Sequence, residues 1–343
     1  MSATRVLYWV FNYMPRWEAV SKEIASLRLG LDGEIDGSLV SINTKDSGFR
    51  LRGRDKRIPL PYGLPLYPLV KPYASRFEIN HLFASAGEPW LTPLLARYNG
   101  VLTIAKDTPM LRGFERNRGA FRRMRAVVVQ GDRDRETLRQ MGLKDEAIWL
   151  IRPGIPLASY QEAQGPFTIL FASSPISRTD FLSRGIYLIV RVAALLPDVR
   201  FLLVWRTSHL KKLERIVANA GVSNIEVIDG VVDDMESVYH RVHAAVLPAL
   251  EHRSFIPCPR SGLESLAHGK PLLLSHLVSI ALDVTRARAG VAFEPTIAGL
   301  KAGILQLQAE YSAYQANTQR YIADKFSPAV HLELYRQLYR TAG

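Results

Sequence analysis

Residues 257–275 read Pro-Cys-Pro-Arg-Ser-Gly-Leu-Glu-Ser-Leu-Ala-His-Gly-Lys-Pro-Leu-Leu-Leu-Ser. This stretch predicts a loop, a short helix capped by Ser261 and stopped at Gly269, and a buried strand that begins after Pro271. The free N–H groups and the positive dipole of such a helix start suit a phosphate group. Glu264, one turn inside, can then accept hydrogen bonds from ribose hydroxyls. The alternative is an ordinary strand–helix unit in which Glu264 only complements the helix dipole.

Short β-rich apolar runs alternate with helical patterns along most of the 343 residues. This alternation predicts an α/β chain with doubly wound parallel sheets covered by helices. A polar stretch over 158–166 separates two similar halves, so we expect domains at 1–158 and 159–325 with a ligand cleft between them. Residues 43–76 predict a long connection with one strand, and residues 318–341 one long helix. Strands are expected at 5–11, 37–42, 79–83, 101–105, 126–130, 147–151, 167–171, 200–205, 225–228, 244–248, 272–275 and 290–293.

Composition narrows the class of protein. Hydrophobic residues make up 48% of the chain and charged residues 22%, which predicts a sizeable core and excludes a disordered tail. The net charge is +12, and residues 1–160 hold 25 basic and 16 acidic side chains, so the first half suits an anionic partner. The single cysteine, Cys258, excludes a disulfide framework and a Cys-rich zinc site. No apolar run approaches the roughly 18 residues of a membrane span, and we expect a cytoplasmic protein.

Residues 257–275 resemble the nucleotide-sugar signature of the family 4 glycosyltransferases, which have the GT-B fold. In that family a Glu-x7-Glu motif ends in Leu-Glu-Ala-Met-Ala-x-Gly-x-Pro. Four other segments stand in the family's order: a strand ending in Pro, an interdomain hinge, a basic residue and Gly before a helix, and a late Gly-led strand. They are Leu247-Pro248-Ala249, Ile151-Arg152-Pro153-Gly154-Ile155, Ser183-Arg184-Gly185 and Gly290-Val291-Ala292-Phe293.

The resemblance implies a GT-B chain of two Rossmann-like domains facing a cleft. The N-terminal domain would bind the acceptor, the C-terminal domain would bind the nucleoside-diphosphate sugar, and a C-terminal helix at about 326–343 would pack back on the N-terminal domain. Glu264 would hold the ribose, and Arg184, with Arg178 as second choice, would neutralise the diphosphate. The implied donor-binding set is Ser173, Arg178, Arg184, Arg206, Arg260, Ser261, Gly262, Leu263 and Glu264. The candidate catalytic residues are Lys106, Asp107 and Glu251.

The chain departs from the family pattern at several points. Ile256 stands eight positions before Glu264, where the family has the first Glu of its motif. Either Glu251 takes this role through a longer loop, or no carboxylate does. Lys106 stands where the family has His, and Pro15-Arg16 replaces a Gly pair. The donor sugar is therefore left open.

A basic cluster lies in the proposed acceptor domain. Its arginines flank Phe114 and Phe121 and are Arg112, Arg116, Arg118, Arg122 and Arg123. The spacing of 118, 122 and 125 would place three arginines on one helical face. A solvated helix is one interpretation, and an acceptor or anionic membrane surface on the inner face of the membrane is the other. No nucleic-acid recognition module is present, so nucleic acid is not an expected partner.

These observations predict a glycosyltransferase of the hexosyltransferase type. It would move a sugar from a nucleoside-diphosphate sugar, of the UDP or GDP form, to the hydroxyl of a glycan, lipid-linked or small-molecule acceptor. The resemblance implies retention of configuration, and we expect no metal or other cofactor because the eight histidines show no ligand spacing. Two alternatives stay open: a sugar-nucleotide epimerase of the same fold, and a catalytically silent GT-B binding or partner subunit.

Overall fold

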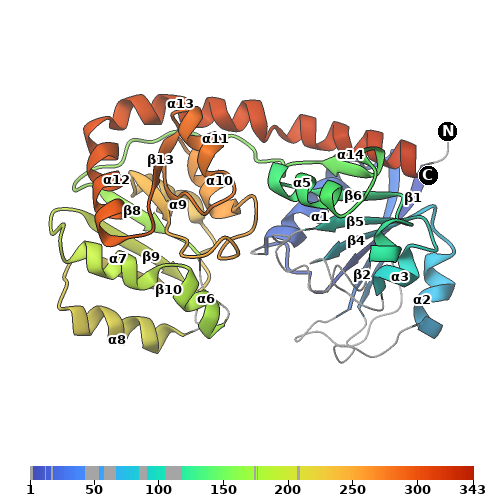
Figure 1. Cartoon of the computed structure of the whole chain (residues 1–343), viewed down its shortest axis with the longest axis horizontal. Coiled ribbons are helices and arrows are strands. Elements are labelled where there is room, and N and C mark those ends of the chain that lie inside the picture. Colours follow the sequence, from blue (N-terminus) through green and yellow to red (C-terminus); the bar gives the residue numbers. More distant parts are fainter. Residues whose placement is uncertain are drawn as a thin grey trace. The chain divides into compact units, whose positions relative to one another are not determined.

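The chain folds into two compact units, shown in Figure 1. The computed structural model describes residues 3–11, 13–16, 18–42, 54–57, 67–84, 91–104, 118–173, 175, 177–206 and 209–343. Unit 1 comprises residues 1–154 and 328–343, and unit 2 comprises residues 155–327. Each unit has its own sheet.

The sheet of unit 1 has seven parallel strands in the order β3-β2-β1-β4-β5-β6-β7. The strand order reverses between β1 and β4, which makes the sheet doubly wound. The strands are β1 (Thr4–Val10), β2 (Ile35–Ser41), β3 (Asp55–Arg57), β4 (Ile79–Ala84), β5 (Gly100–Ile104), β6 (Ala126–Val129) and β7 (Ile148–Leu150).

Successive residues of β1 point to opposite faces of this sheet, and each face carries its own apolar core. Val6 packs with α1 (Ala19–Gly30) and α14 (Pro328–Ala342) on one face. Leu7 packs with α3 (Leu91–Leu95) and α5 (Asp132–Gln140) on the other, where Ala74 of α2 (Tyr67–Ala74) also lies. A short 3-10 helix (Asp145–Ala147) precedes β7. Unit 1 is therefore a three-layer α/β unit.

A chain of hydrogen bonds between buried side chains fastens α14 to the sheet of unit 1. His81 of β4 bonds the hydroxyls of Tyr339 and Thr103, each at 2.7 Å. The hydroxyl of Tyr335 lies 3.2 Å from that of Thr103 and also donates to the Glu23 carboxylate at 3.2 Å. Burial lowers the pKa of His81 to about 3, so the ring stays neutral. These polar groups satisfy one another inside the unit, as buried polar groups must.

The sheet of unit 2 has six parallel strands in the order β10-β9-β8-β11-β12-β13. Its strand order reverses between β8 and β11. The strands are β8 (Thr168–Phe171), β9 (Arg200–Trp205), β10 (Ile225–Asp229), β11 (Ala244–Leu247), β12 (Leu272–Ser275) and β13 (Gly290–Phe293). The helices are α6 (Arg178–Ser183), α7 (Ile186–Ala193), α8 (Leu210–Ala220), α9 (Met235–His240), α10 (Arg260–Ala267), α11 (Ala281–Arg286), α12 (Ile297–Ala309) and α13 (Tyr311–Lys325).

The observed strands confirm the predicted α/β class and lie within about two residues of their expected bounds. The expected strand within 43–76 is β3, but helix α2 was not foreseen. The single helix predicted over 318–341 is wrong: α13 ends at Lys325 and α14 starts at Pro328. Proline lacks an N–H group and disfavours helical geometry in the residue before it, so the helix is broken there.

Candidate functional site

The carboxyl ends of β8 and β11 are where a doubly wound sheet places its ligand, because the strand order reverses between these two strands. Ser173 follows β8, and Pro248 follows β11. Leu247 and Pro248 also join the two parts of the site: the turn with Arg184 packs against Pro248, and α10 packs against Leu247. The candidate site is therefore built around the end of β11.

Arg184 follows α6 and is held in place from two sides. Its Nη1 donates to the Ser173 hydroxyl at 2.7 Å, and its guanidinium carbon lies 5.6 Å from the centroid of the Phe255 ring. Burial lowers the pKa of Arg184, Asp180 partly offsets this, and the positive charge of Arg206 lowers the pKa further. An arginine remains charged in a protein. Two neighbouring guanidinium groups at the carboxyl edge of the sheet thus create a place that favours an anion.

The turn that carries Arg184 requires a glycine. Gly185 has a φ of 71°, and a Cβ atom there would lie 2.1 Å from the carbonyl oxygen of Pro248. The carbonyl of Ser183 accepts hydrogen bonds from the Leu250 N–H at 2.7 Å and from the Ser254 hydroxyl at 2.8 Å. The loop after β11 is therefore fixed against the turn, and Arg184 is presented by a rigid support.

Helix α10 begins at the site. Its N-cap is Pro259, which makes no side-chain cap hydrogen bond. The prediction that Ser261 caps the helix is wrong: Ser261 lies in the first turn, and its carbonyl accepts a hydrogen bond from the Tyr239 hydroxyl at 3.2 Å. A Cβ atom on Gly262 would lie 2.9 Å from Leu247, so a glycine lets the first turn of the helix approach the end of β11 closely.

Glu264 is partly open to solvent and has three neighbours that fix its place. Its carboxylate accepts a hydrogen bond from Arg260 Nε at 2.9 Å, with 23% of the Glu264 side chain exposed. Burial raises the pKa of Tyr239 well above its usual range, and the charge and hydrogen bond of Glu264 raise it further, so the phenol stays protonated. His268 stacks on Tyr239 at 4.3 Å between ring centroids and contacts the Glu264 carbonyl through Nδ1 at 2.7 Å.

The structure thus brings Ser173, Arg184 and Arg206 together, and Arg260 beside Glu264. Arg178 is exposed at the start of α6, and Leu263 is buried in α10. Glu251 is exposed and forms an ion pair with Arg253 at 2.6 Å. The sequence-based interpretation missed Tyr239, His268 and Phe255, because a buried tyrosine or phenylalanine has the same pattern as any core residue and a lone histidine has no ligand spacing.

Four predicted residues, Lys106, Asp107, Arg112 and Arg116, lie outside the described residues. Among the others in the basic cluster, Arg118 lies in a helical turn over 118–121, but Arg122 and Arg123 have left the helix. The expected helical face of arginines is therefore wrong. Arg118 Nε instead donates to the carbonyl of Met141 at 3.1 Å, at the C-cap of α5 where a cation is favourable.

Among the residues that the structure describes, no group of three or more His, Cys, Asp or Glu side chains could hold a metal ion. Within the same residues, no helix has the length and apolarity required to span a bilayer.

One family model matches part of the chain. Residues 167–310 match the family model described as "Glycosyl transferases group 1". This confirms the prediction that the chain is a glycosyltransferase and supports the group 1 type. No curated protein sequence matches the chain.

Solved structures with the GT-B fold are similar over nearly the whole chain. Sucrose-phosphate synthase from Thermosynechococcus elongatus is 13% identical, with a TM-score of 0.77 and 98% of each chain covered. The Anabaena protein HepE, solved with UDP and glucose, is 12% identical, with a TM-score of 0.78 and coverage of 98% of this chain and 100% of that one. The lipopolysaccharide outer core galactosyltransferase WaaB is 9% identical, with a TM-score of 0.75 and coverage of 98% and 99%. These similarities confirm the predicted GT-B fold.

Proposed function

We propose that the chain transfers a sugar from a nucleoside-diphosphate sugar to an acceptor hydroxyl. The observation that carries this proposal is the placement of a half-buried Arg184 and a partly open Glu264 on two segments that pack against Pro248 and Leu247, at the end of β11. The Arg184 guanidinium suits a diphosphate, and the Glu264 carboxylate suits the two hydroxyls of a ribose. Both lie inside residues 167–310, the part that matches the glycosyltransferase family.

Each group has a role in the transfer. The bond between the sugar's anomeric carbon and the diphosphate oxygen breaks, a bond to the acceptor oxygen forms, and the acceptor hydroxyl loses its proton. Negative charge grows on the diphosphate as it leaves, and Arg184, assisted by Arg206 and by the first-turn N–H groups of α10, would stabilise that charge. Glu264 would accept hydrogen bonds from the ribose. Because Arg260 already donates to Glu264, it would have to share this carboxylate with the nucleotide.

UDP is the first donor nucleotide to test, because HepE was solved with UDP. For the acceptor we propose a membrane- or lipid-linked glycan, since WaaB acts on the lipopolysaccharide outer core and the basic surplus of this chain lies in residues 1–160. Retention of configuration and transfer without a metal remain parts of this proposal. So do the catalytic roles of Lys106, Asp107 and Glu251, and donor binding by Arg178 and Leu263.

The test is thermal unfolding of the full chain with UDP, GDP, ADP and dTDP and their sugars. We expect one of these nucleotides to raise the melting temperature, because a ligand that binds only the folded state stabilises it. Glu264→Ala should weaken binding of that nucleotide by about 100-fold, through loss of two charge-assisted hydrogen bonds to the ribose. Titration calorimetry measures the affinity, and hydrolysis of the stabilising donor measures activity.

The matched control is Glu214→Ala, which removes an exposed carboxylate on α8 of the same unit. Its affinity should equal that of the unchanged protein. Equal affinity of Glu264→Ala and the unchanged protein would contradict the proposed site, and so would the absence of any stabilising nucleotide.

One observation favours a second candidate function, a catalytically silent nucleotide-binding subunit. Ile256 cannot ionise, and Glu251 forms an exposed ion pair with Arg253 at 2.6 Å, which it would have to share or break to act as the first Glu of the family motif. This candidate predicts nucleotide binding that depends on Glu264, with no turnover of any donor. Turnover of one donor in the hydrolysis assay excludes it.

A further inference from the structure

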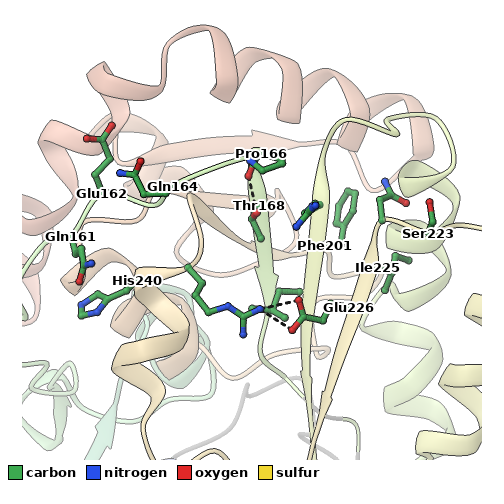
Figure 2. A pocket seen from close by; sticks show the side chains of 14 residues that line it. Gln161, Glu162, Gln164, Pro166, Thr168, Phe201, Ser223, Ile225, Glu226 and His240 are labelled. Atoms are coloured by element: carbon green, nitrogen blue, oxygen red, sulfur yellow. Dashed lines mark hydrogen bonds and ion pairs between the residues drawn. The ribbon is translucent and has the colours of Figure 1, made fainter.

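A pocket lies on unit 2, at the amino ends of the strands and thus opposite the candidate site. It has a volume of about 560 Å³ and is drawn in Figure 2. Thr168, Arg200 and Ile225 line it, and these are the first residues of β8, β9 and β10. Ser173 and Arg206, in contrast, follow the last residues of β8 and β9. The volume falls within the roughly 300–1,000 Å³ of ligand pockets.

Internal hydrogen bonds fix one wall of this pocket. The side-chain amide of Asn224 donates to three backbone carbonyls within residues 193–199, at 3.0, 2.9 and 2.8 Å. Arg241 donates to both carboxylate oxygens of Glu226, at 2.8 and 2.9 Å, and Figure 2 shows these two bonds reaching Glu226. Such a wall is formed before any ligand arrives, which lowers the cost of binding.

The opposite wall is the segment that leads into β8, and a buried lysine holds it. Lys270 Nζ donates to the carbonyl of Gln161 at 2.5 Å and lies 5.0 Å from the centroid of the Tyr160 ring. The Thr168 hydroxyl donates to the carbonyl of Pro166 at 2.8 Å. The backbone on both sides of the pocket is therefore anchored.

Five polar side chains that line the pocket have unused hydrogen-bonding capacity. Within the described part of the chain, none of them bonds another protein group through its side chain; they are Gln161, Glu162, Gln164, Arg200 and Ser223. These five side chains include hydrogen-bond donors, hydrogen-bond acceptors and groups that can both donate and accept. A ligand that carries several hydroxyl groups would match it, since each hydroxyl donates one hydrogen bond and accepts others.

The charges of the lining exclude other ligand classes. Arg200 and Arg241 are balanced by Glu162 and Glu226, so neither a phosphate nor a cation finds a matching excess of charge. Most of the surrounding side chains are polar, which disfavours an apolar ligand. We propose that this pocket binds an uncharged saccharide, at a site separate from the candidate nucleotide site.

This proposal goes beyond the proposed function and does not depend on it. A saccharide held at the amino edge of the sheet would keep a glycan attached to unit 2 while the carboxyl edge is free for the nucleotide. Tethering of this kind raises the effective concentration of a long glycan around the protein without any new contact at the other site.

Saturation-transfer NMR on the full chain tests the proposal, with maltose, cellobiose, lactose and chitobiose as probes. At least one disaccharide should give a saturable signal that persists in excess UDP. The double variant Arg200→Ala/Gln164→Ala should weaken this binding by about tenfold or more, through loss of hydrogen bonds. Arg191→Ala, which removes an exposed arginine of α7, is the matched control and should bind as the unchanged protein does.

Absence of a saturable signal with all four probes overturns the proposal. Equal binding by the double variant, displacement by UDP, or displacement by inorganic phosphate does so as well, since the last would mark an anion site. A cooperative thermal unfolding transition at the melting temperature of the unchanged protein shows that the variant is folded. If the double variant fails to fold, Ser223→Trp supplies a second test, because a bulky ring at this exposed position would fill the pocket and should abolish the signal.

Discussion

Polar side chains are placed in opposite ways in the two units. In unit 1 they run through the interior: His81, Thr103, Tyr335, Tyr339 and Glu23 form one buried chain between the sheet and α14. In unit 2 one apolar core fills most of the interior, with Lys270 and Ser265 also buried, and the polar clusters described above lie at the two ends of the strands. The same doubly wound architecture is thus combined with a closed polar network in one unit and with open polar clusters in the other.

This difference predicts which polar side chains contribute to stability and which are available for ligand binding. A network whose members satisfy one another has nothing to offer a ligand, and its loss is felt in stability. Arg184 beside Arg206, and Glu264 with 23% of its side chain exposed, can still gain from a partner. Substitutions within the closed network of unit 1 should therefore change stability, whereas substitutions of the open polar side chains of unit 2 should change binding.

The largest expected effect comes from a substitution in the turn that carries Arg184. Gly185→Ala should cost about 4 kcal/mol of unfolding free energy, because the backbone is left-handed and the new methyl group would strike the carbonyl of Pro248. Gly165→Ala is the control: its φ is 85°, but nothing lies within 4 Å, so it should cost only about 1 kcal/mol. Urea unfolding measures both. Equal costs would show that the close approach to Pro248 does not matter.

The closed network of unit 1 should respond to pH. Burial lowers the pKa of His81 from 6.5 to about 3, so the folded chain keeps it neutral while the unfolded chain protonates it. Stability should fall as the pH drops from 6.5 towards 3, by up to about 1.4 kcal/mol per pH unit. His81→Gln keeps hydrogen-bonding groups but cannot titrate in this range, so its urea unfolding should show a slope smaller by about one proton. An unchanged slope would contradict the role of His81.

The smallest expected effect concerns Tyr239, which lies beside Glu264 in the proposed nucleotide site. Tyr239→Phe keeps the stacking on His268 but removes the hydroxyl that donates to the Ser261 carbonyl and interacts with Glu264. Nucleotide affinity should fall by about fivefold, the worth of one hydrogen bond, with little change in melting temperature. Tyr187→Phe, at an exposed tyrosine of α7, is the control. A large loss of stability with unchanged affinity would place Tyr239 among purely structural residues.

Much of the fold could be predicted from local pattern. Parallel strands buried on both faces give continuous apolar runs, and the strand of residues 200–205 was expected with its observed bounds. Helix α10 and the glycine before α7 also carry local signals. The break between α13 and α14 at Pro328 falls inside the helical pattern expected over 318–341, although the resemblance implied a C-terminal helix from about 326.

The site could be predicted only in part, because its remaining partners come from distant elements. Arg184 and Glu264 stand in recognisable local motifs. Their neighbours Phe255 and Tyr239 lie 71 and 25 residues away, and no local rule links them. The pocket at the amino edge of β8, β9 and β10 was likewise unpredictable, since parallel pairing alone brings its three strand starts together.

Because Tyr335 and Tyr339 lie on α14, near the C-terminal end of the sequence, unit 1 is completed after unit 2 during synthesis. Tyr335 and Tyr339 emerge from the ribosome only after all of unit 2, residues 155–327, has been made. Until then His81 and Glu23 lack the hydrogen bonds that these two tyrosine hydroxyls supply in the finished unit. Unit 2 is a contiguous stretch and can fold as soon as it is complete, whereas unit 1 begins first and finishes last. Residues 1–154 therefore lack helix α14 during the time in which residues 155–327 are synthesised.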